Sequence, residues 1–172
     1  MNYLEYAQSL LELQSPTGVQ KPTNFRYYAA ISFGFVEELH EYIQAQENQG
    51  DVLAEAGDVL AYGMLLVMSR EASYQSFPDF TRTTVNPAEV FSISETYDFE
   101  PNHLKYPGYF SGKFKRYFRE NANVSVLEIA AATLLVIVSS GYTFDQVAQA
   151  NINKLQSRFD RGVLMKGSGD NR

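Results

Sequence analysis

Apolar residues recur at intervals of three and four along most of this chain, and this spacing constrains the fold more than any other feature. It is the period of one face of an α-helix, whereas no segment combines alternation of period two with the turn residues that separate strands. Between residues 24 and 46 the pattern comprises Phe25, Tyr28, Phe35, Leu39 and Tyr42, with Ser32 as a polar exception. The sequence therefore predicts an all-α protein.

The same criteria predict helices at residues 3–13, 24–46, 51–70, 109–121, 124–140 and 143–161 within a single domain of 172 residues. Asp51 and Thr143 are the expected N-caps, and residues 15–18 (Ser-Pro-Thr-Gly) indicate a turn. Residues 71–108 contain four prolines and many aromatic residues, which predicts a long connection with one helix at residues 87–96. Long loops of this kind often carry function. Residues 165–172 are expected to form a flexible tail.

A faint internal repeat suggests how the helices are arranged. A shift of 70 positions pairs Val59 with Ile129 and Leu65 with Leu135, and a shift of 74 pairs Leu53 with Leu127. The two registers differ by about one helical turn. Either one fits a duplicated helical hairpin that forms a four-helix-bundle core, and a coincidence between two apolar helices explains the pattern equally well.

Composition excludes several classes of protein. A formal charge of −6 and a pI near 4.9 argue against a nucleic-acid partner, and the absence of cysteine excludes disulfides, thiolate-bound metals and a thiol nucleophile. The N-terminal residues do not resemble a signal peptide. The longest apolar run, residues 129–138, is shorter than the ~20 residues of a membrane span. We expect a cytoplasmic protein with no membrane partner.

Acidic residues on two neighbouring helices carry the strongest functional signal. Glu38 and Glu41, and again Glu55 and Asp58, are three positions apart, which places each pair within about 60° on its helix and beside an apolar arc. Glu37 points about 100° away from Glu38. An antiparallel hairpin would bring the four carboxylates together, where they must bind protons or cations. Oxygen ligands of this kind suit Mg²⁺ or Mn²⁺. The alternative is that both pairs are solvated helix faces.

These motifs resemble the MazG-like all-α nucleoside triphosphate pyrophosphohydrolases, which include dimeric dUTPases and phosphoribosyl-ATP pyrophosphatases. The family pattern, EExxE followed by ExxD, is similar to residues 37–41 (EELHE) and residues 55–58 (EAGD). The resemblance implies that Glu38, Glu41, Glu55 and Asp58 are Mg²⁺ ligands. It also implies that Glu37 is an outer ligand or orients the attacking water.

The C-terminal part of the chain is similar to the same family, whose members often end in an NxxKLxxR helix followed by RG. Here the motif comprises Asn151, Lys154 and Arg158, which fall within about 60° of one another on a helix. In the family this polar stripe faces the metal site and holds phosphates. The alternative is an exposed basic helix end that interacts with the helix dipole.

Residues 113–120 resemble a further family segment, KVKKxxRD, although they lie far downstream of their usual place. The helix that follows has Ser125 and Glu128 where the family has an ExxD pair. We interpret the second half as a degenerate copy of the first that lost its metal ligands and kept its cations. Lys115 and Arg119, four positions apart, would then reach a triphosphate bound by the first half.

The sequence thus predicts a Mg²⁺-dependent enzyme that cleaves nucleoside triphosphates, of ribose or deoxyribose type, to the monophosphate and pyrophosphate. The family resemblance implies a homodimer or homotetramer. One alternative is a non-catalytic helical nucleotide-binding or accessory protein of the same fold, which the missing acids of the second half favour. Another is a di-iron carboxylate bundle, because Glu37 and His40 form an ExxH pair, although that architecture needs two such pairs.

Overall fold

A computed structural model describes residues 1–14, 25–70 and 102–162 of the chain. These residues form α1 (Tyr3–Gln14), α2 (Phe25–Glu47), α3 (Val52–Arg70), the 3-10 helix η3 (His103–Lys105), α5 (Tyr106–Glu120), α6 (Val126–Ser140) and α7 (Phe144–Asp160). No strand occurs among the residues described, so the predicted all-α class is confirmed. The predictions for residues 15–18, 87–96 and 165–172 fall outside them.

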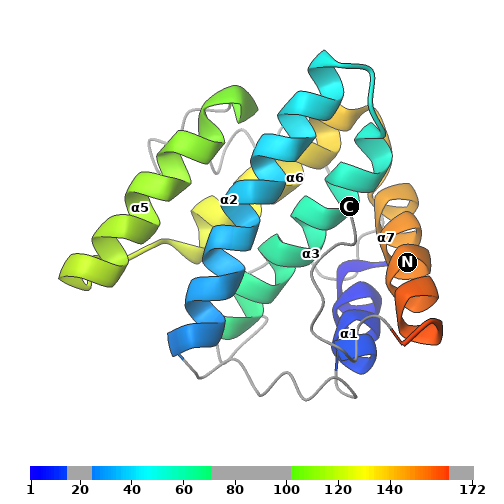
Figure 1. Ribbon diagram of the computed structural model, residues 1–172, viewed down its shortest axis with the longest axis horizontal. Coiled ribbons are helices and arrows are strands. Elements are labelled where there is room, and N and C mark those ends of the chain that lie inside the picture. Colours follow the sequence, from blue (N-terminus) through cyan, green and yellow to red (C-terminus); the bar gives the residue numbers. More distant parts are fainter. Residues whose placement is uncertain (15–24, 71–101, 163–172) are drawn as a thin grey trace.

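The α3 helix occupies the centre of the fold and contacts three other helices. It packs along α2 on one side and against α6 and α7 on the others, while α5 packs on α2 and α1 on α7 (Figure 1). Five of its apolar residues are at most 1% exposed, and they are Ala56, Val59, Leu60, Met64 and Leu66. By length and composition, residues Val52–Ser69 of α3 would also fit a membrane span, but 61% of this segment is buried inside the protein. Its apolar composition is that of a core helix.

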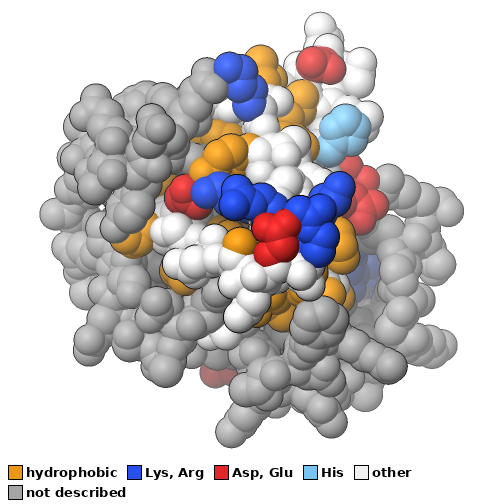
Figure 2. All heavy atoms as spheres, turned by 90° about the vertical axis from the view of Figure 1, so that its left-hand side faces the viewer, with side chains coloured by type: hydrophobic (Ala, Val, Ile, Leu, Met, Phe, Trp, Pro, Cys, Tyr) orange, Lys and Arg blue, Asp and Glu red, His pale blue; other side chains and the backbone are white. Residues whose placement is uncertain are grey.

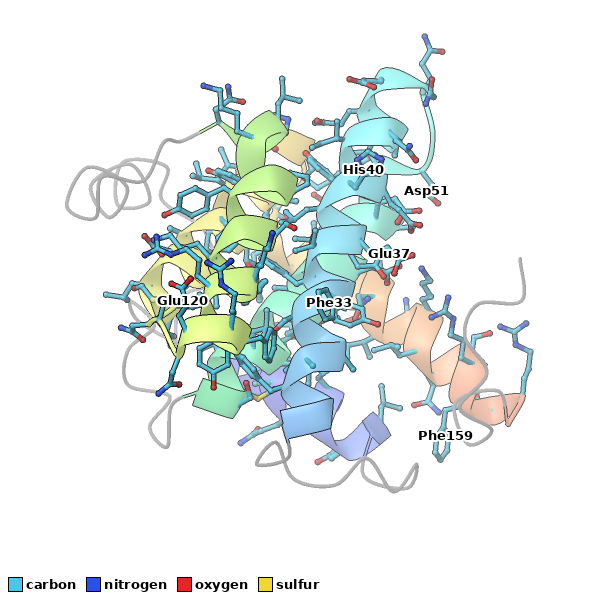
Figure 3. The ribbon with its side chains drawn as sticks, turned by 60° about the vertical axis from the view of Figure 1, so that its left-hand side comes forward. Phe33, Glu37, His40, Asp51, Glu120 and Phe159 are labelled. Atoms are coloured by element: carbon cyan, nitrogen blue, oxygen red, sulfur yellow. The ribbon has the colours of Figure 1, made fainter. Side chains whose placement is uncertain are left out.

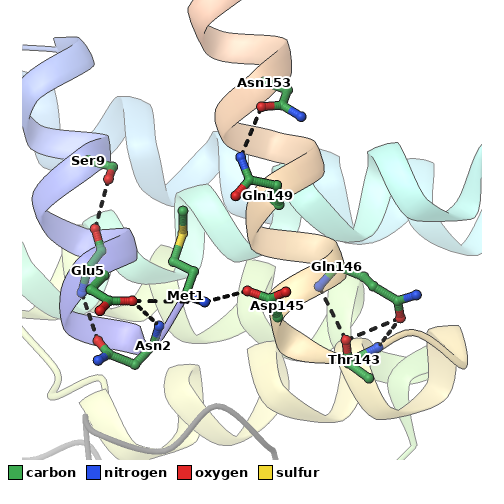
Figure 4. Close-up of polar contacts among 9 residues, drawn as sticks. All are labelled: Met1, Asn2, Glu5, Ser9, Thr143, Asp145, Gln146, Gln149 and Asn153. Carbon is green, nitrogen blue, oxygen red and sulfur yellow. Dashed lines mark hydrogen bonds and ion pairs between the residues drawn. The ribbon is translucent and has the colours of Figure 1, made fainter.

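The predicted caps explain where α3 and α7 begin. The Asp51 carboxylate accepts a hydrogen bond from the Ala54 backbone at 3.0 Å. Thr143 and Gln146 form a reciprocal capping box at the start of α7 (Figure 4). Beside it, the Met1 amino group contacts Asp145, and this contact joins the start of α1 to the start of α7.

The prediction that a connection extends to residue 108 is wrong, because residues 103–108 are helical. Pro107, which we interpreted as a helix breaker, lies in the first turn of α5. At that position the missing N–H has no intrahelical partner to lose, so proline is tolerated there. The helix therefore begins at Tyr106, earlier than predicted, and Tyr106 and Phe110 are buried in the core.

Small residues allow α3 to approach its neighbours closely. A Cβ atom on Gly63 would lie 2.1 Å from Oγ1 of Thr133 on α6, and one on Gly34 of α2 would lie 2.2 Å from the ring of Tyr62. Gly63 and Thr133 are also equivalent in the 70-residue register of the internal repeat. Contact between equivalent residues is what a two-fold axis between two copies would produce. The duplication itself stays a prediction.

We expect Gly63→Ala to destabilise the protein by about 1–3 kcal/mol, because the new methyl group forces α3 and α6 apart. Thr133 cannot easily turn away, since its hydroxyl donates a hydrogen bond to the Ile129 carbonyl at 2.8 Å. Gly112→Ala is the matched control on α5, where an added Cβ meets nothing within 4 Å. It should stabilise by about 0.5–1 kcal/mol through helix propensity. Urea denaturation measures the free energy of unfolding of both variants. Equal changes in the two variants would contradict the close approach of α3 and α6.

Candidate metal centre

Three acidic side chains from two helices converge at one place. Glu38 of α2 and Glu55 and Asp58 of α3 each offer an oxygen atom, and these atoms lie within 4.8 Å of one another. All three side chains are buried or half-buried. We refer to Glu38, Glu55 and Asp58 as the acid trio.

The local sequence explains why the trio forms. Residues 48–51 connect α2 to α3 through a tight turn, in which Gln49 has a φ of 56° and the Gly50 N–H bonds to the Ala45 carbonyl at 2.8 Å. A connection this short makes the two helices antiparallel neighbours. Their apolar arcs, which include Leu39 and Val59, then pack together and bring the adjacent acids face to face.

Glu38 is in the least favourable position for a negative charge. Burial first, and then the negative charges of Asp58, Glu41 and Glu55, raise the pKa of Glu38 from 4.5 to about 8, against the opposing charge of Lys154. Its buried Oε2 atom has no hydrogen-bond partner among the described residues. An unpartnered buried carboxylate oxygen is unusual in a folded protein and fits a position that a cation would complete.

Asp58, which is 9% exposed, is held on both of its oxygen atoms by α7. Oδ1 accepts a hydrogen bond from the Asn151 carboxamide at 3.1 Å, and Oδ2 forms an ion pair with the Lys154 ammonium group. Gly57 makes this approach possible, because a Cβ there would lie 3.0 Å from Cβ of Asn151. Two residues of the predicted C-terminal motif thus contact one residue of the acid trio.

Tyr6 on α1 also belongs to this network, and the sequence analysis missed it. Its side chain is fully buried, and its hydroxyl donates a hydrogen bond to Oδ1 of Asn151 at 2.8 Å. Burial, and then the charge of Asp58, raise the pKa of Tyr6 well above its usual value, so the hydroxyl remains a donor. The position of Tyr6 in a short amphipathic helix indicates only a core residue, and no sequence motif indicates its hydrogen-bond partner.

The other acids predicted at this place lie around the acid trio. Glu41 is half-buried and is outside the trio, although its charge contributes to the raised pKa of Glu38. Glu37 and His40 are exposed on α2, and a ring nitrogen of His40 lies 3.1 Å from the Gln44 amide (Figure 3). Neither residue of the ExxH pair belongs to the acid trio. Arg158 lies one turn beyond Lys154 on α7 and is half-buried.

The structure does not bring Lys115 and Arg119 to the acid trio, contrary to our expectation. Both side chains are exposed on α5, and α2 and α3 lie between α5 and α7 (Figures 1 and 3). Viewed from the α5 side, lysine and arginine side chains gather on this face with acidic side chains among them (Figure 2). Arg119 pairs with the neighbouring Glu120. The reason is packing: the buried aromatic face of α5 rests on the side of α2 remote from α7.

A second buried acid lies in the other half of the fold. Glu128 of α6 is 5% exposed and accepts hydrogen bonds from the Tyr109 hydroxyl at 2.8 Å and from the Lys113 ammonium at 3.4 Å. In the 70-residue register Glu128 corresponds to Asp58 of the acid trio. Here a lysine of the chain itself neutralises a lone acid, which agrees with the interpretation that this half carries a cation in place of further acids.

Comparison with known protein families, with characterised proteins and with solved structures finds no match to this chain. The family resemblance of the motifs therefore stays a prediction.

In protein freed of divalent ions, we expect Glu38 to make the free energy of unfolding fall as pH rises from about 4.5 to about 8. In this window the folded state retains the Glu38 proton, because its pKa is about 8, whereas the unfolded chain loses it above 4.5. The unfolded state then binds fewer protons, which gives a negative slope of stability against pH. Glu38→Gln should remove this contribution and Glu37→Gln should keep it. Urea denaturation across the pH range measures the difference, and identical slopes for wild type and Glu38→Gln would contradict it.

We expect Lys113→Met to destabilise the protein by about 2 kcal/mol, because it leaves the buried Glu128 with only the Tyr109 hydroxyl as its partner. The exposed Lys115→Met is the matched control and should change stability by less than about 0.5 kcal/mol. Adding Glu128→Gln to Lys113→Met should recover most of the loss, since a neutral amide costs less to bury than an unpaired charge. Thermal denaturation of the three variants measures these changes in stability. Equal effects of the two lysine substitutions would show that the Lys113–Glu128 pair does not stabilise the fold.

Proposed function

We propose that this protein is a divalent-metal-dependent nucleotide pyrophosphohydrolase that converts nucleoside triphosphates, of ribose or deoxyribose type, to the monophosphate and pyrophosphate. The observation that carries the proposal is the acid trio, whose oxygen atoms lie within 4.8 Å of one another next to Lys154 of α7. Carboxylates on one side and ammonium and guanidinium groups on the other suit a metal polyphosphate.

The residues present fit Mg²⁺, with Mn²⁺ as a possible substitute. Glu38, Glu55 and Asp58 would hold the ion, and the unpartnered Oε2 atom of Glu38 supplies a free ligand position. Glu41 is near enough to act on Glu38 through its charge. The set consists of oxygen ligands without His or Cys, which is the preference of Mg²⁺ and Mn²⁺. When bound, such an ion neutralises phosphate charge and lowers the pKa of a coordinated water.

The remaining residues act on the substrate. Lys154 and Arg158, one turn apart on α7, would bind the β- and γ-phosphate oxygens and stabilise the charge that develops on the leaving pyrophosphate. Glu37, on the solvent side of α2, would orient the water that attacks the α-phosphorus. The new bond joins the water oxygen to this phosphorus, and the bond that breaks joins it to the oxygen bridging the α- and β-phosphates. The water gives up a proton to solvent.

The ion pair between Lys154 and Asp58 favours a second candidate, a protein of the same fold that binds nucleotides without cleaving them. In such a protein the lysine neutralises Asp58 in place of a metal ion, as Lys113 does for Glu128. The two candidates differ in turnover and in the need for a divalent ion, so one experiment separates them.

The test incubates the purified protein with Mg²⁺ and a panel of ribo- and deoxyribonucleoside triphosphates and resolves the products by chromatography. We expect monophosphate and pyrophosphate, and no turnover when a chelator removes the ion. Glu38→Gln and Asp58→Asn should each lower kcat by more than about 100-fold, because the metal supplies several kcal/mol of transition-state stabilisation. Glu47→Gln, an exposed acid at the end of α2, should retain wild-type activity.

Three results would count against the proposal. Diphosphate and orthophosphate as products would overturn the bond specificity. Tight nucleotide binding by a wild-type protein without turnover would establish the binding protein instead. Full activity of both Glu38→Gln and Asp58→Asn, with the fold intact, would remove the acid trio from the reaction.

A further inference from the structure

The network around Asp58 extends one residue beyond the groups that would contact a metal or a substrate. Tyr6, Asn151 and Asp58 come from α1, α7 and α3, and they are 0%, 1% and 9% exposed. Two hydrogen bonds join them in series, 2.8 Å from the Tyr6 hydroxyl to Asn151 Oδ1 and 3.1 Å from Asn151 Nδ2 to Asp58 Oδ1. Because all three side chains are buried, water does not readily replace either partner in these hydrogen bonds.

The direction of these bonds follows from chemistry. A carboxamide has an acceptor end and a donor end, and either end can face a given neighbour when the side chain turns over. The Asp58 carboxylate only accepts hydrogen bonds, so it faces the donor end of the Asn151 amide, and the acceptor end of the amide then receives the hydrogen bond of the Tyr6 hydroxyl. A turned-over amide would place its oxygen against a carboxylate oxygen and lose the hydrogen bond that the Tyr6 hydroxyl donates, which is costly in a buried site.

We propose that Tyr6 is a positioning residue of the acid trio: it anchors the acceptor end of the Asn151 carboxamide and thereby holds the amide that orients the Asp58 carboxylate. This inference rests on the proposed function for its effect on metal binding, and on the hydrogen bonds alone for its effect on Asn151. With Asn151 on Oδ1 and Lys154 on Oδ2, the Asp58 carboxylate is held at both ends. Partners that orient a ligand in this way typically change metal affinity or activity by 10–100-fold when they are removed.

The α1 helix thereby gains a role beyond packing. It contacts α7, and its buried residues Ala7 and Leu10 lie in the core beside Tyr6. The ring of Tyr6 also meets Phe144 of α7 edge to face, with centroids 6.2 Å apart. Removal of the hydroxyl alone keeps these contacts, so the orienting effect can be separated from the packing.

The test compares Tyr6→Phe with Tyr42→Phe. Tyr42 is equally buried, but its hydroxyl bonds to Ser139 at 2.7 Å and to the Val136 carbonyl at 3.2 Å, away from the acid trio. Both substitutions remove one buried hydroxyl from a core aromatic ring. Calorimetric titration with Mg²⁺ or Mn²⁺ in the absence of nucleotide measures metal affinity, and chemical denaturation measures stability.

For Tyr6→Phe we expect a loss of about tenfold in Mg²⁺ affinity and a fall in kcat with little change in KM. Tyr42→Phe should keep the wild-type metal affinity at a comparable loss of stability. A second readout needs no metal: the side-chain NH₂ resonances of Asn151 in NMR spectra should shift and exchange faster with solvent in Tyr6→Phe, and stay unchanged in Tyr42→Phe.

The two readouts separate this inference from the proposed function. If the wild-type protein binds no divalent ion, the metal site fails, and the Asn151 resonances still decide whether Tyr6 orients the amide. Unchanged Asn151 resonances in Tyr6→Phe overturn the inference, and so does a metal affinity equal to that of Tyr42→Phe in a protein that binds the ion.

Discussion

Charge compensation at Asp58 is the interaction on which the arrangement of this protein depends. Packing α2 against α3 brings Glu38, Glu55 and Asp58 together, and three carboxylates in half-buried surroundings repel one another. Two features of the structure reduce this repulsion. Glu38 holds a proton over a wide pH range, and α7 supplies an amide and an ammonium group to Asp58. The position of α7 on α3 is therefore coupled to the charge of the trio.

The two halves of the fold compensate their buried acidic side chains in different ways. In the first half several acids gather, and α7 supplies Asp58 with the Asn151 amide and the Lys154 ammonium group. In the second half a single acid, Glu128, is neutralised by Lys113 and capped by Tyr109. A buried charge is tolerated only with such partners. The first half therefore draws its compensation from α7, at the far end of the chain, whereas the second half draws it from the neighbouring helix α5.

Periodicity sufficed to predict the helices, because the apolar positions of α2, α3, α6 and α7 repeat every three or four residues and Asp51 and Thr143 are good N-caps. The start of α5 was missed because a proline is compatible both with a loop and with a first helical turn. Spacing also predicted that Glu38, Glu55 and Asp58 meet. It did not reveal Tyr6, nor that α5 turns Lys115 and Arg119 away from the acids, because both depend on contacts between helices far apart in sequence. Helix periodicity shows which face is buried and leaves open which neighbour covers it.

The hydrogen bonds that complete the acid trio span 145 residues from Tyr6 to Asn151 and 93 residues from Asn151 to Asp58. Long-range contacts of this kind close late, since the chain entropy of large loops is lost before they form. During synthesis the hairpin of α2 and α3 emerges well before α7, so Asp58 meets Asn151 and Lys154 only after nearly all of the chain has been made.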